Sequence, residues 1–346
     1  MDTIDVIPGS RSAREILSHS RTLVDPGLRA AVDTLPPPTR HIAGYHFGWW
    51  DENAEPAEHK AGKAIRPALV LLCARAVGSS DIEALPAAVA VELVHNFSLV
   101  HDDVIDRDVT RRHRPTAWSV FGDGAAILAG DAMSTLACAV LADSGHPAAM
   151  DGIKLVNRAI QELIDGQHAD VSFETREQID PQECRAMAAA KTGALLGCAC
   201  AIGARFGGGS PHQVERLRAF GTDLGLAFQH VDDLLGIWGD PQATGKPVYS
   251  DLRSRKKSLP VVAALASDSP AAAALSSLYS GTEPLRDEEI TRAAALIEEA
   301  GGRQWSSTEA AGLLDRALAS LAEVGAEESA ASDLTTLARL VTRRDR

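Results

Sequence analysis

The sequence predicts an all-helical fold, and three observations carry the prediction. Apolar residues make up 45% of the 346 residues and aromatic residues only 4%. Ala and Leu dominate the apolar share, and both favour helices over strands. Glycines follow successive stretches of helical length, as they do where helices are joined by short loops. Apolar and acidic side chains also recur at steps of three and four.

Taken in order, the elements begin with a polar segment of residues 1–40 that ends in a stop at Pro36-Pro37-Pro38. Residues 44–56 are predicted to be a loop, and long helical patterns follow. One of them covers residues 85–106, and another begins at Gly225. Residues 207–210, with the sequence GGGS, lack the frame of a nucleotide-binding loop and are expected to be a connector. Because no linker is visible, residues 41–346 are predicted to form one domain.

Composition excludes several classes of protein. Lys and Arg total 34 against 47 Asp and Glu, a net charge of −13, which argues against nucleic acid as a partner. The five cysteines are expected to be buried free thiols, as in a reducing cytosol. The acidic start MDTIDVIPGS does not resemble a secretory signal, and the longest apolar stretches are too short for a membrane span or carry Asp131. A cytoplasmic protein without a membrane span is therefore predicted.

The helix predicted over residues 85–106 places Glu92, His95, Asp102 and Asp106 on one face. Carboxylates one turn apart repel each other, so Asp102, Asp103 and Asp106 need a compensating cation. Mg²⁺ suits such a set, especially where a phosphate supplies further oxygens. The alternative interpretation is a solvated acidic helix end.

The segment beginning at Gly225 repeats this pattern with Asp232 and Asp233, but position 236 is Gly instead of a third acid. One metal ligand is therefore missing relative to the first helix. Two acidic helices are nevertheless what is needed to hold metal ions around a diphosphate from both sides.

Basic residues form three compact groups despite the acidic total: residues 62–67, 111–114 and 253–257. Lys63 and Arg66 are three residues apart and are predicted to share one face at the start of a helix. Arginine offers a planar fork that matches phosphate oxygens. Each group alone would be read as a surface patch, but their coincidence with two acidic pairs favours more than one anion site.

Together these segments resemble the trans-isoprenyl diphosphate synthases, also called polyprenyl synthetases. The resemblance extends from about Tyr45 to Pro260. Its blocks are GKAIRP (62–67), ELVHNFSLVHDDVID (92–106), RRHRPT (111–116), GD (130–131), GQHADVSFE (166–174), KTGALL (191–196), GLAFQHVDDLLG (225–236), TGKP (244–247) and DLRSRKKSLP (251–260). The resemblance implies helices around a central apolar cavity, with the two aspartate helices facing each other at its mouth.

The family pattern also implies roles for individual residues. The expected ligands of Mg²⁺, with three ions per active site, are Asp102, Asp103, Asp106, Asp232 and Asp233. The expected contacts of the allylic diphosphate are Arg111, Lys191, Thr192, Gln229, Lys246 and Lys256. The expected isopentenyl diphosphate pocket consists of Lys63, Arg66, His95 and Arg112, over which Arg343, Arg344 or Arg346 would close.

Two positions depart from the family pattern. His113 stands where RRGxPT has Gly, and this change is not expected to touch the phosphate contacts. Gly236 stands where the second motif has an acid, so water or Asp233 would complete that metal site.

The implied reaction ionises an allylic diphosphate, joins the cation to the double bond of isopentenyl diphosphate and loses a proton. Chain growth stops where a bulky side chain blocks the cavity. Phe97, five residues before Asp102 and beside the small Ser98, resembles the stop in geranylgeranyl (C20) synthases. A helical wheel places Phe97 about 140° from Asp102, so periodicity gives this role no independent support.

Alternatives remain open at this stage. A farnesyl (C15) product is the nearest one. A terpene cyclase would share the fold but has no use for a second diphosphate pocket, and a non-catalytic regulatory subunit would tolerate loss of the aspartates. A homodimer is expected from the resemblance alone.

Overall fold

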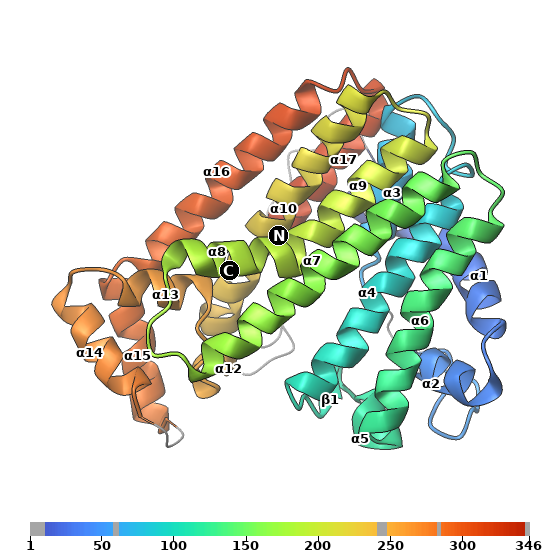
Figure 1. Ribbon diagram of the computed structural model, residues 1–346. Coiled ribbons are helices and arrows are strands. Elements are labelled where there is room, and N and C mark those ends of the chain that lie inside the picture. Colours follow the sequence, from blue (N-terminus) through green and yellow to red (C-terminus); the bar gives the residue numbers. More distant parts are fainter. Residues whose placement is uncertain (1–10, 58–61, 241–247, 282–284, 343–346) are drawn as a thin grey trace. The chain divides into compact units, whose positions relative to one another are not determined.

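The computed structural model describes residues 11–57, 62–240, 248–281 and 285–342, and it confirms the prediction of an all-helical fold (Figure 1). In these ranges the only sheet is one short antiparallel pair, β1 (Thr110–Arg111) with β2 (Arg114–Pro115). The chain divides into two compact units. Unit 1 comprises Met1–Ile160, Cys198–Arg218 and Leu321–Leu337, and unit 2 comprises Gln161–Gly197, Ala219–Ser320 and Ala338–Arg346. The prediction of one domain over residues 41–346 stays a prediction.

The helices fall into three groups. Those of unit 1 are α1 (Ala13–Asp33), α2 (Pro37–Phe47), α3 (Ile65–Ala76), α4 (Leu85–Ile105), α5 (Ala117–Phe121) and α6 (Asp123–Asp143). Those of unit 2 are α8 (Pro181–Ala188), the π-helical turn η1 (Ala189–Gly193), α12 (Ser250–Arg253), α13 (Leu259–Leu265), α14 (Pro270–Tyr279) and α15 (Asp287–Glu299). Helices with residues in both units are α7 (Ala149–Thr175), α9 (Ala194–Phe206), α10 (Pro211–Trp238), α16 (Gly302–Ala322) and α17 (Glu328–Thr342).

The polar N-terminal segment contains a helix. A capping box between Ser12 and Glu15 starts α1, which buries a stripe of apolar residues including Ile16 and Val24. The prolines that end α1 also begin α2, because proline is well suited to the first helical positions. The predicted loop at 44–56 was wrong at its start, since α2 continues to Phe47 and ends only at Gly48, whose φ of 82° is left-handed.

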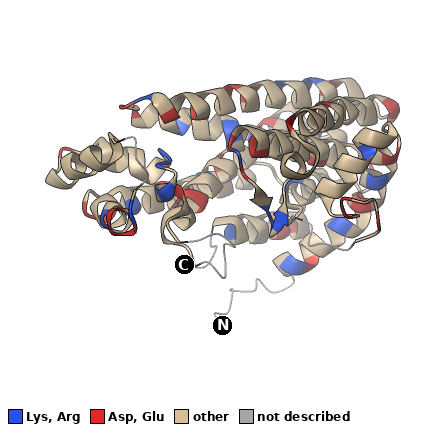
Figure 2. Ribbon diagram, turned by 90° about the horizontal axis from the view of Figure 1, so that it is seen from below, with Lys and Arg blue, Asp and Glu red and all other residues tan. Residues whose placement is uncertain are grey.

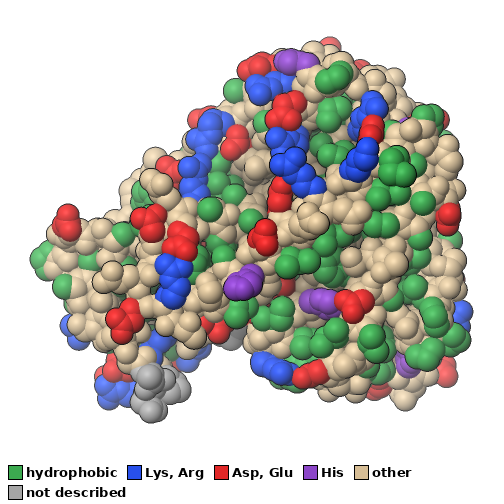
Figure 3. Space-filling view, in the orientation of Figure 1, with side chains coloured by type: hydrophobic (Ala, Val, Ile, Leu, Met, Phe, Trp, Pro, Cys, Tyr) green, Lys and Arg blue, Asp and Glu red, His purple; other side chains and the backbone are tan. Residues whose placement is uncertain are grey.

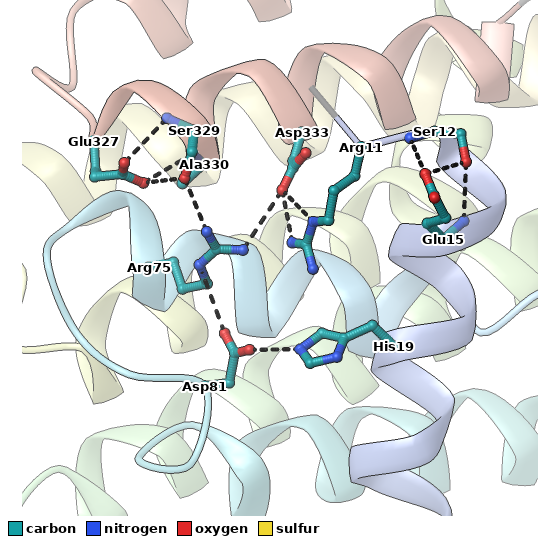
Figure 4. A network of polar contacts seen from close by, with 10 residues as sticks. All are labelled: Arg11, Ser12, Glu15, His19, Arg75, Asp81, Glu327, Ser329, Ala330 and Asp333. Atoms are coloured by element: carbon teal, nitrogen blue, oxygen red, sulfur yellow. Dashed lines mark hydrogen bonds and ion pairs between the residues drawn. The ribbon is translucent and has the colours of Figure 1, made fainter. Parts of the chain in front are cut away.

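A polar network joins the start of the described chain to α17 within unit 1 (Figure 4). Asp333 is 2% exposed and accepts hydrogen bonds from Arg11 at 2.6 Å and Arg75 at 3.5 Å. Arg75 also lies near Asp81, which pairs with His19 of α1 at 2.9 Å. A buried carboxylate needs such partners, so these contacts fix α1, α3 and α17 together.

The core of unit 1 is built on close helix packing, in which α4 packs extensively against α6. Gly203 of α9 approaches the backbone of α3 so closely that a Cβ there would lie 2.2 Å from the Val70 carbonyl oxygen. The cysteines are free, as predicted, and four of the five are buried, while Cys138 is partly exposed. The expected connector at residues 207–210 lies between α9 and α10.

The core of unit 2 has two apolar clusters. One gathers Leu252, Leu275 and Ile297 with their neighbours, and the other gathers Phe173, Leu226 and Leu313. The second cluster packs α7, α8, α10, α13 and α16 together.

The prediction that the apolar stretches are too short for a membrane span was wrong. In the described ranges, the helical stretches Asp123–Asp143 and Pro181–Phe206 are long and apolar enough by length and composition, and the bent pair α13–α14 would add a third. The window in Pro181–Phe206 is 78% buried, whereas that in Asp123–Asp143 is only 33% buried. The α6 helix therefore exposes apolar side chains, among them Ile127 and Leu128. Figure 3 shows hydrophobic side chains exposed at many places on the face that it draws.

Candidate active site

The three aspartates at the end of α4 differ in their exposure to solvent. Asp103 is 1% exposed, and its Oδ1 accepts a hydrogen bond of 2.6 Å from Arg111 Nε. Burial raises the pKa of Asp103 to about 6, although the charge of Arg111 lowers it. Asp102 is partly exposed, and Asp106, the C-cap of α4, is exposed. The two outer aspartates are therefore the accessible pair, one helical turn apart.

The residues RRHRPT form a tight hairpin after α4. Thr110 pairs with Pro115 and Arg111 with Arg114, which leaves Arg112 and His113 as the two turn residues. Their φ angles of 53° and 64° are the left-handed values of a type I′ turn. Gly would adopt this conformation freely, so the family glycine at position 113 has a conformational explanation.

Unit 1 also holds the residues expected to bind isopentenyl diphosphate. Arg66 Nη1 lies 3.1 Å from His95 Nε2, so the imidazole accepts from the guanidinium. Burial, followed by the charge of Arg66, lowers the pKa of His95 well below its usual value and keeps it neutral. The Arg112 guanidinium lies against Gly62, where a Cβ would be 2.4 Å from one of its nitrogens.

The predicted helical register of Lys63 was wrong. The α3 helix begins at Ile65, and Ala64 before it has a left-handed φ of 52°, so exposed Lys63 precedes the helix while Arg66 lies in its first turn. The two cations remain close in sequence but do not share a helix face.

A buried polar chain that the sequence did not reveal lies behind this pocket. The Asn96 amide donates to Glu92 Oε1 at 3.0 Å, and its oxygen lies 3.1 Å from His46 Nε2. The amide oxygen can only accept, so His46 donates through Nε2. Burial and the charge of Arg112 lower the pKa of His46 to about 3. Burial raises the pKa of Glu92.

In unit 2 the predicted residues of the second motif form a hydrogen-bonded chain. Thr192 Oγ1 donates to Gln229 Oε1 at 2.6 Å, and Gln229 Nε2 donates to Asp233 Oδ1 at 2.8 Å. Asp233 Oδ2 accepts from the Leu259 N–H at 2.9 Å, at the start of α13. Burial raises the pKa of Asp233 to about 6. Asp232 is exposed, so the division between buried and accessible aspartates recurs here.

Lys191 lies in η1, the π-helical turn that interrupts α8 and α9. Its Nζ pairs with Asp170 Oδ2 at 2.6 Å. Gly166 of α7 allows this turn to approach α7 closely, since a Cβ at position 166 would lie 2.5 Å from the backbone nitrogen of Lys191. Such π-turns occur frequently at functional sites. Asp170, in the block GQHADVSFE, is a functional candidate that the sequence reasoning did not single out.

Asp251 occupies the space that a side chain at position 236 would need. A Cβ on Gly236 would lie 2.3 Å from Asp251 Oδ2. Although burial lowers the pKa of Lys256, the charges of Asp233 and Asp251 raise it above its usual value, so this lysine faces both carboxylates. A carboxylate thus stands beside position 236 even though the chain has no acid there.

The structure describes some of the remaining predicted residues and not others. Phe97 is 5% exposed and packs edge-on against His101 with 5.6 Å between ring centroids, and the neighbouring Ser98 is buried. The residues that lie outside the described part of the chain are Lys246, Arg343, Arg344 and Arg346. In the ranges that are described, no three His, Cys, Asp or Glu side chains converge on a metal position by themselves.

Comparison with known proteins identifies the family of this chain. The polyprenyl synthetase family matches residues 49–297. A (2E,6E)-farnesyl diphosphate synthase of Mycobacterium tuberculosis is 45% identical over 97% of this chain and 94% of its own. A geranylgeranyl diphosphate synthase of the same organism is 41% identical over 96% and 94%. The crystal structure of a polyprenyl synthetase from Streptomyces coelicolor A3(2) superposes with a TM-score of 0.91 at 48% identity, covering 94% of this chain and 98% of its own.

The fold and the paired acidic motifs define an all-helical prenyl-chain synthase, and the match covers most of the chain. The protein belongs to the polyprenyl synthetase family. It is a trans-prenyltransferase that performs chain elongation, and its family uses isopentenyl and allylic diphosphates with a divalent metal.

Proposed function

We propose that this enzyme condenses isopentenyl diphosphate with allylic diphosphates and releases geranylgeranyl diphosphate (C20). One observation carries the chain length: a single buried aromatic side chain, Phe97, five residues before Asp102, with the small Ser98 beside it. Burying each additional CH₂ favours elongation by about 0.8 kcal/mol, so growth continues until a side chain blocks it. Phe97 is that block in this proposal.

The carboxylate set suits Mg²⁺, a hard cation that prefers oxygen ligands and takes several of them from phosphate and water. Asp103 Oδ2 is buried and has no hydrogen-bond partner in unit 1, so this end of α4 has unused acceptor capacity. The proposed ligands, for three ions per site, are Asp102, Asp103, Asp106, Asp232 and Asp233. When bound, the metal neutralises charge that develops on the departing diphosphate.

Basic and polar side chains of the chain itself are proposed to bind the two diphosphates. We assign the isopentenyl diphosphate to Lys63, Arg66, His95 and Arg112, all in unit 1. Neutral His95 accepts from Arg66 and thereby orients its guanidinium. We assign the allylic diphosphate to Arg111, Lys191, Thr192, Gln229, Lys246 and Lys256. Fixed donors that point at developing charge are the most effective form of catalysis in a site that excludes water.

Farnesyl diphosphate (C15) is the second candidate product. The observation that favours it is the higher identity to the mycobacterial farnesyl diphosphate synthase, 45% against 41% for the geranylgeranyl diphosphate synthase. Both alternatives use the same site and differ only in where elongation stops.

The proposal includes a homodimer. In α6, Leu128 is 66% exposed and Ile127 41%, and α5 adds Val120 at 36%. An exposed apolar surface of this kind is typical of protein–protein contact, and a second copy of the chain is the proposed partner. Acidic and basic residues are interspersed along the helices in the view of Figure 2. Because the net charge is −13, the proposal includes no nucleic-acid partner. The cytoplasm stays the predicted compartment.

The test is incubation of the purified chain with Mg²⁺, isopentenyl diphosphate and each allylic starter, followed by mass spectrometry of the dephosphorylated products. Consumption of isopentenyl diphosphate with a C20 product is expected. A terpene cyclase would leave isopentenyl diphosphate unconsumed, and a regulatory subunit would show no turnover. In Phe97→Ala longer products are expected, and an unchanged distribution would remove Phe97 from the proposal. Ser98→Ala is the matched control.

A further inference from the structure

The hairpin that presents Arg111 and Arg112 is held in an unfavourable conformation. Both turn residues, Arg112 and His113, have left-handed φ angles, which non-glycine side chains rarely adopt. A two-stranded hairpin this short is not stable by itself in water. The arrangement therefore persists only because surrounding structure over-determines it.

Arg114, the residue after the turn, supplies the first part of that support. Its Nη1 donates to the Tyr45 carbonyl oxygen at 3.0 Å and its Nη2 to the Trp50 carbonyl oxygen at 3.4 Å. The guanidinium also lies 4.3 Å from the centroid of the Tyr45 ring. Arg114 thus ties β2 to the C-terminal end of α2 through a hydrogen bond and a cation–π contact, and to the segment after α2 through a second hydrogen bond.

Tyr45 supplies the second part. Its hydroxyl donates to the Pro115 carbonyl oxygen at 2.9 Å, directly after Arg114 in β2. The Tyr45 ring is 3% exposed and packs edge-on against Phe121. Because the ring is immobilised by packing, the bond to Pro115 transmits the position of α2 to the hairpin.

Tyr45 and Arg114 line one pocket together with the two arginines of the hairpin. Its lining includes Tyr45, Phe47, Asp103, Arg111, Arg112 and Arg114. On β1, Arg111 is oriented by Asp103, whereas Arg112 lies in the turn itself and its guanidinium approaches Gly62. The left-handed turn decides where the Arg112 guanidinium points.

We propose that Arg114, acting with Tyr45, is a positioning residue that holds the strained Arg112–His113 turn so that Arg111 and Arg112 face the diphosphates. This inference rests on the proposed roles of the two arginines. It adds a function for α2, which lies outside the motifs that carry the family resemblance.

The experiment measures equilibrium binding of isopentenyl diphosphate alone, and steady-state kinetics with dimethylallyl diphosphate, for Arg114→Gln and Tyr45→Phe in the full-length enzyme. Lost charged hydrogen bonds of this kind raise a dissociation constant about tenfold, which is the effect expected for Arg114→Gln. A smaller rise of about threefold is expected for Tyr45→Phe, which loses one neutral hydrogen bond. In both variants KM should rise while kcat changes little, because the reacting groups are retained.

Arg29→Gln is the matched control. Arg29 makes a cation–π contact with Trp49 at 4.7 Å, near the same end of α2, and has no hydrogen bond to the hairpin. It should bind isopentenyl diphosphate as the wild type does. Adding His113→Gly to Arg114→Gln should restore affinity several-fold, since glycine accepts the left-handed conformation without support.

A lower melting temperature of Arg114→Gln with unchanged affinity would overturn the proposal, as would an equal loss in Arg29→Gln or the absence of any rescue by His113→Gly. These outcomes are distinct from failure of the proposed function. In that case the wild type itself would neither bind isopentenyl diphosphate nor consume it.

Discussion

The acidic end of α4 and the acidic segment of α10 each bury one aspartate of a DD pair, but different neighbours hold it. In each, the second aspartate is buried and its pKa is raised to about 6, while the first is more accessible. Asp103 takes its hydrogen bond from the side chain of Arg111, whereas Asp233 takes its bonds from Gln229 and from the backbone of α13. In each DD pair one carboxylate therefore also holds neighbouring structure through hydrogen bonds, while the other is open to solvent.

Substituting the accessible and buried aspartates separately gives the largest expected effect. Asp102→Asn and Asp232→Asn should each lower kcat/KM on the order of 10³-fold, because a proposed metal ligand is lost at developing charge. Their melting temperatures should stay near that of the wild type.

The buried counterparts are the controls. Asp103→Asn removes the charge that pairs with Arg111, and Asp233→Asn leaves one oxygen for the two donors Gln229 and Leu259, so their melting temperatures should fall. If the accessible and buried variants lost stability equally, the division of labour within each DD pair would be refuted.

Restoring the family acid at position 236 tests the difference between the two segments. Because a Cβ at Gly236 would lie 2.3 Å from Asp251 Oδ2, Gly236→Asp should lower the free energy of unfolding by about 2 kcal/mol, as measured by urea denaturation. Combining it with Asp251→Ala should recover most of that loss. If the losses in free energy of unfolding of the two single variants simply added in the double variant, Asp251 would not occupy the space of the missing side chain.

Because the Asp251 carboxylate lies where the family acid at position 236 would be, we expect it to support the second metal site. Asp251→Asn should weaken Mg²⁺ binding in the presence of inorganic pyrophosphate about tenfold, a typical cost for a group that supports metal ligands. Titration calorimetry measures this directly. Asp268→Asn, at an exposed position, is the control and should bind Mg²⁺ with unchanged affinity.

The smallest expected effect concerns the histidine behind the first region. The pKa of His46 is about 3 in the folded chain, below its usual 6.5, so its contribution to stability is present above pH 6.5 and is lost as pH falls toward 3. Between pH 6.5 and 5.5 this group should lower the free energy of unfolding by about 1 kcal/mol.

His46→Gln should lack this part of the pH dependence while it keeps a donor for Asn96. Urea denaturation at the two pH values provides the comparison. An identical slope in wild type and variant would show that His46 titrates normally in the folded chain.

Much of the site was readable because its residues lie on regular helices. The steps of three and four from Glu92 to Asp106 predicted the helix that became α4, and the segment from Gly225 lies on α10. The register of Lys63 was missed because Ala64 leaves the helical region of φ, which sequence spacing does not reveal. The apolar length of α6 was underestimated since one aspartate interrupts it.

The sequence by itself determined the all-helical class, the positions of the two aspartate motifs and the groups of cations, since these depend on local periodicity and residue type. Only the tertiary structure decided which carboxylate of each pair is buried, that Asp251 lies beside Gly236, and that Arg114 and Tyr45 hold the hairpin. The last two facts come from groups that are close in space but 15 to 70 positions apart along the chain. Burial and close approach are properties of the packed chain, and no local pattern encodes them.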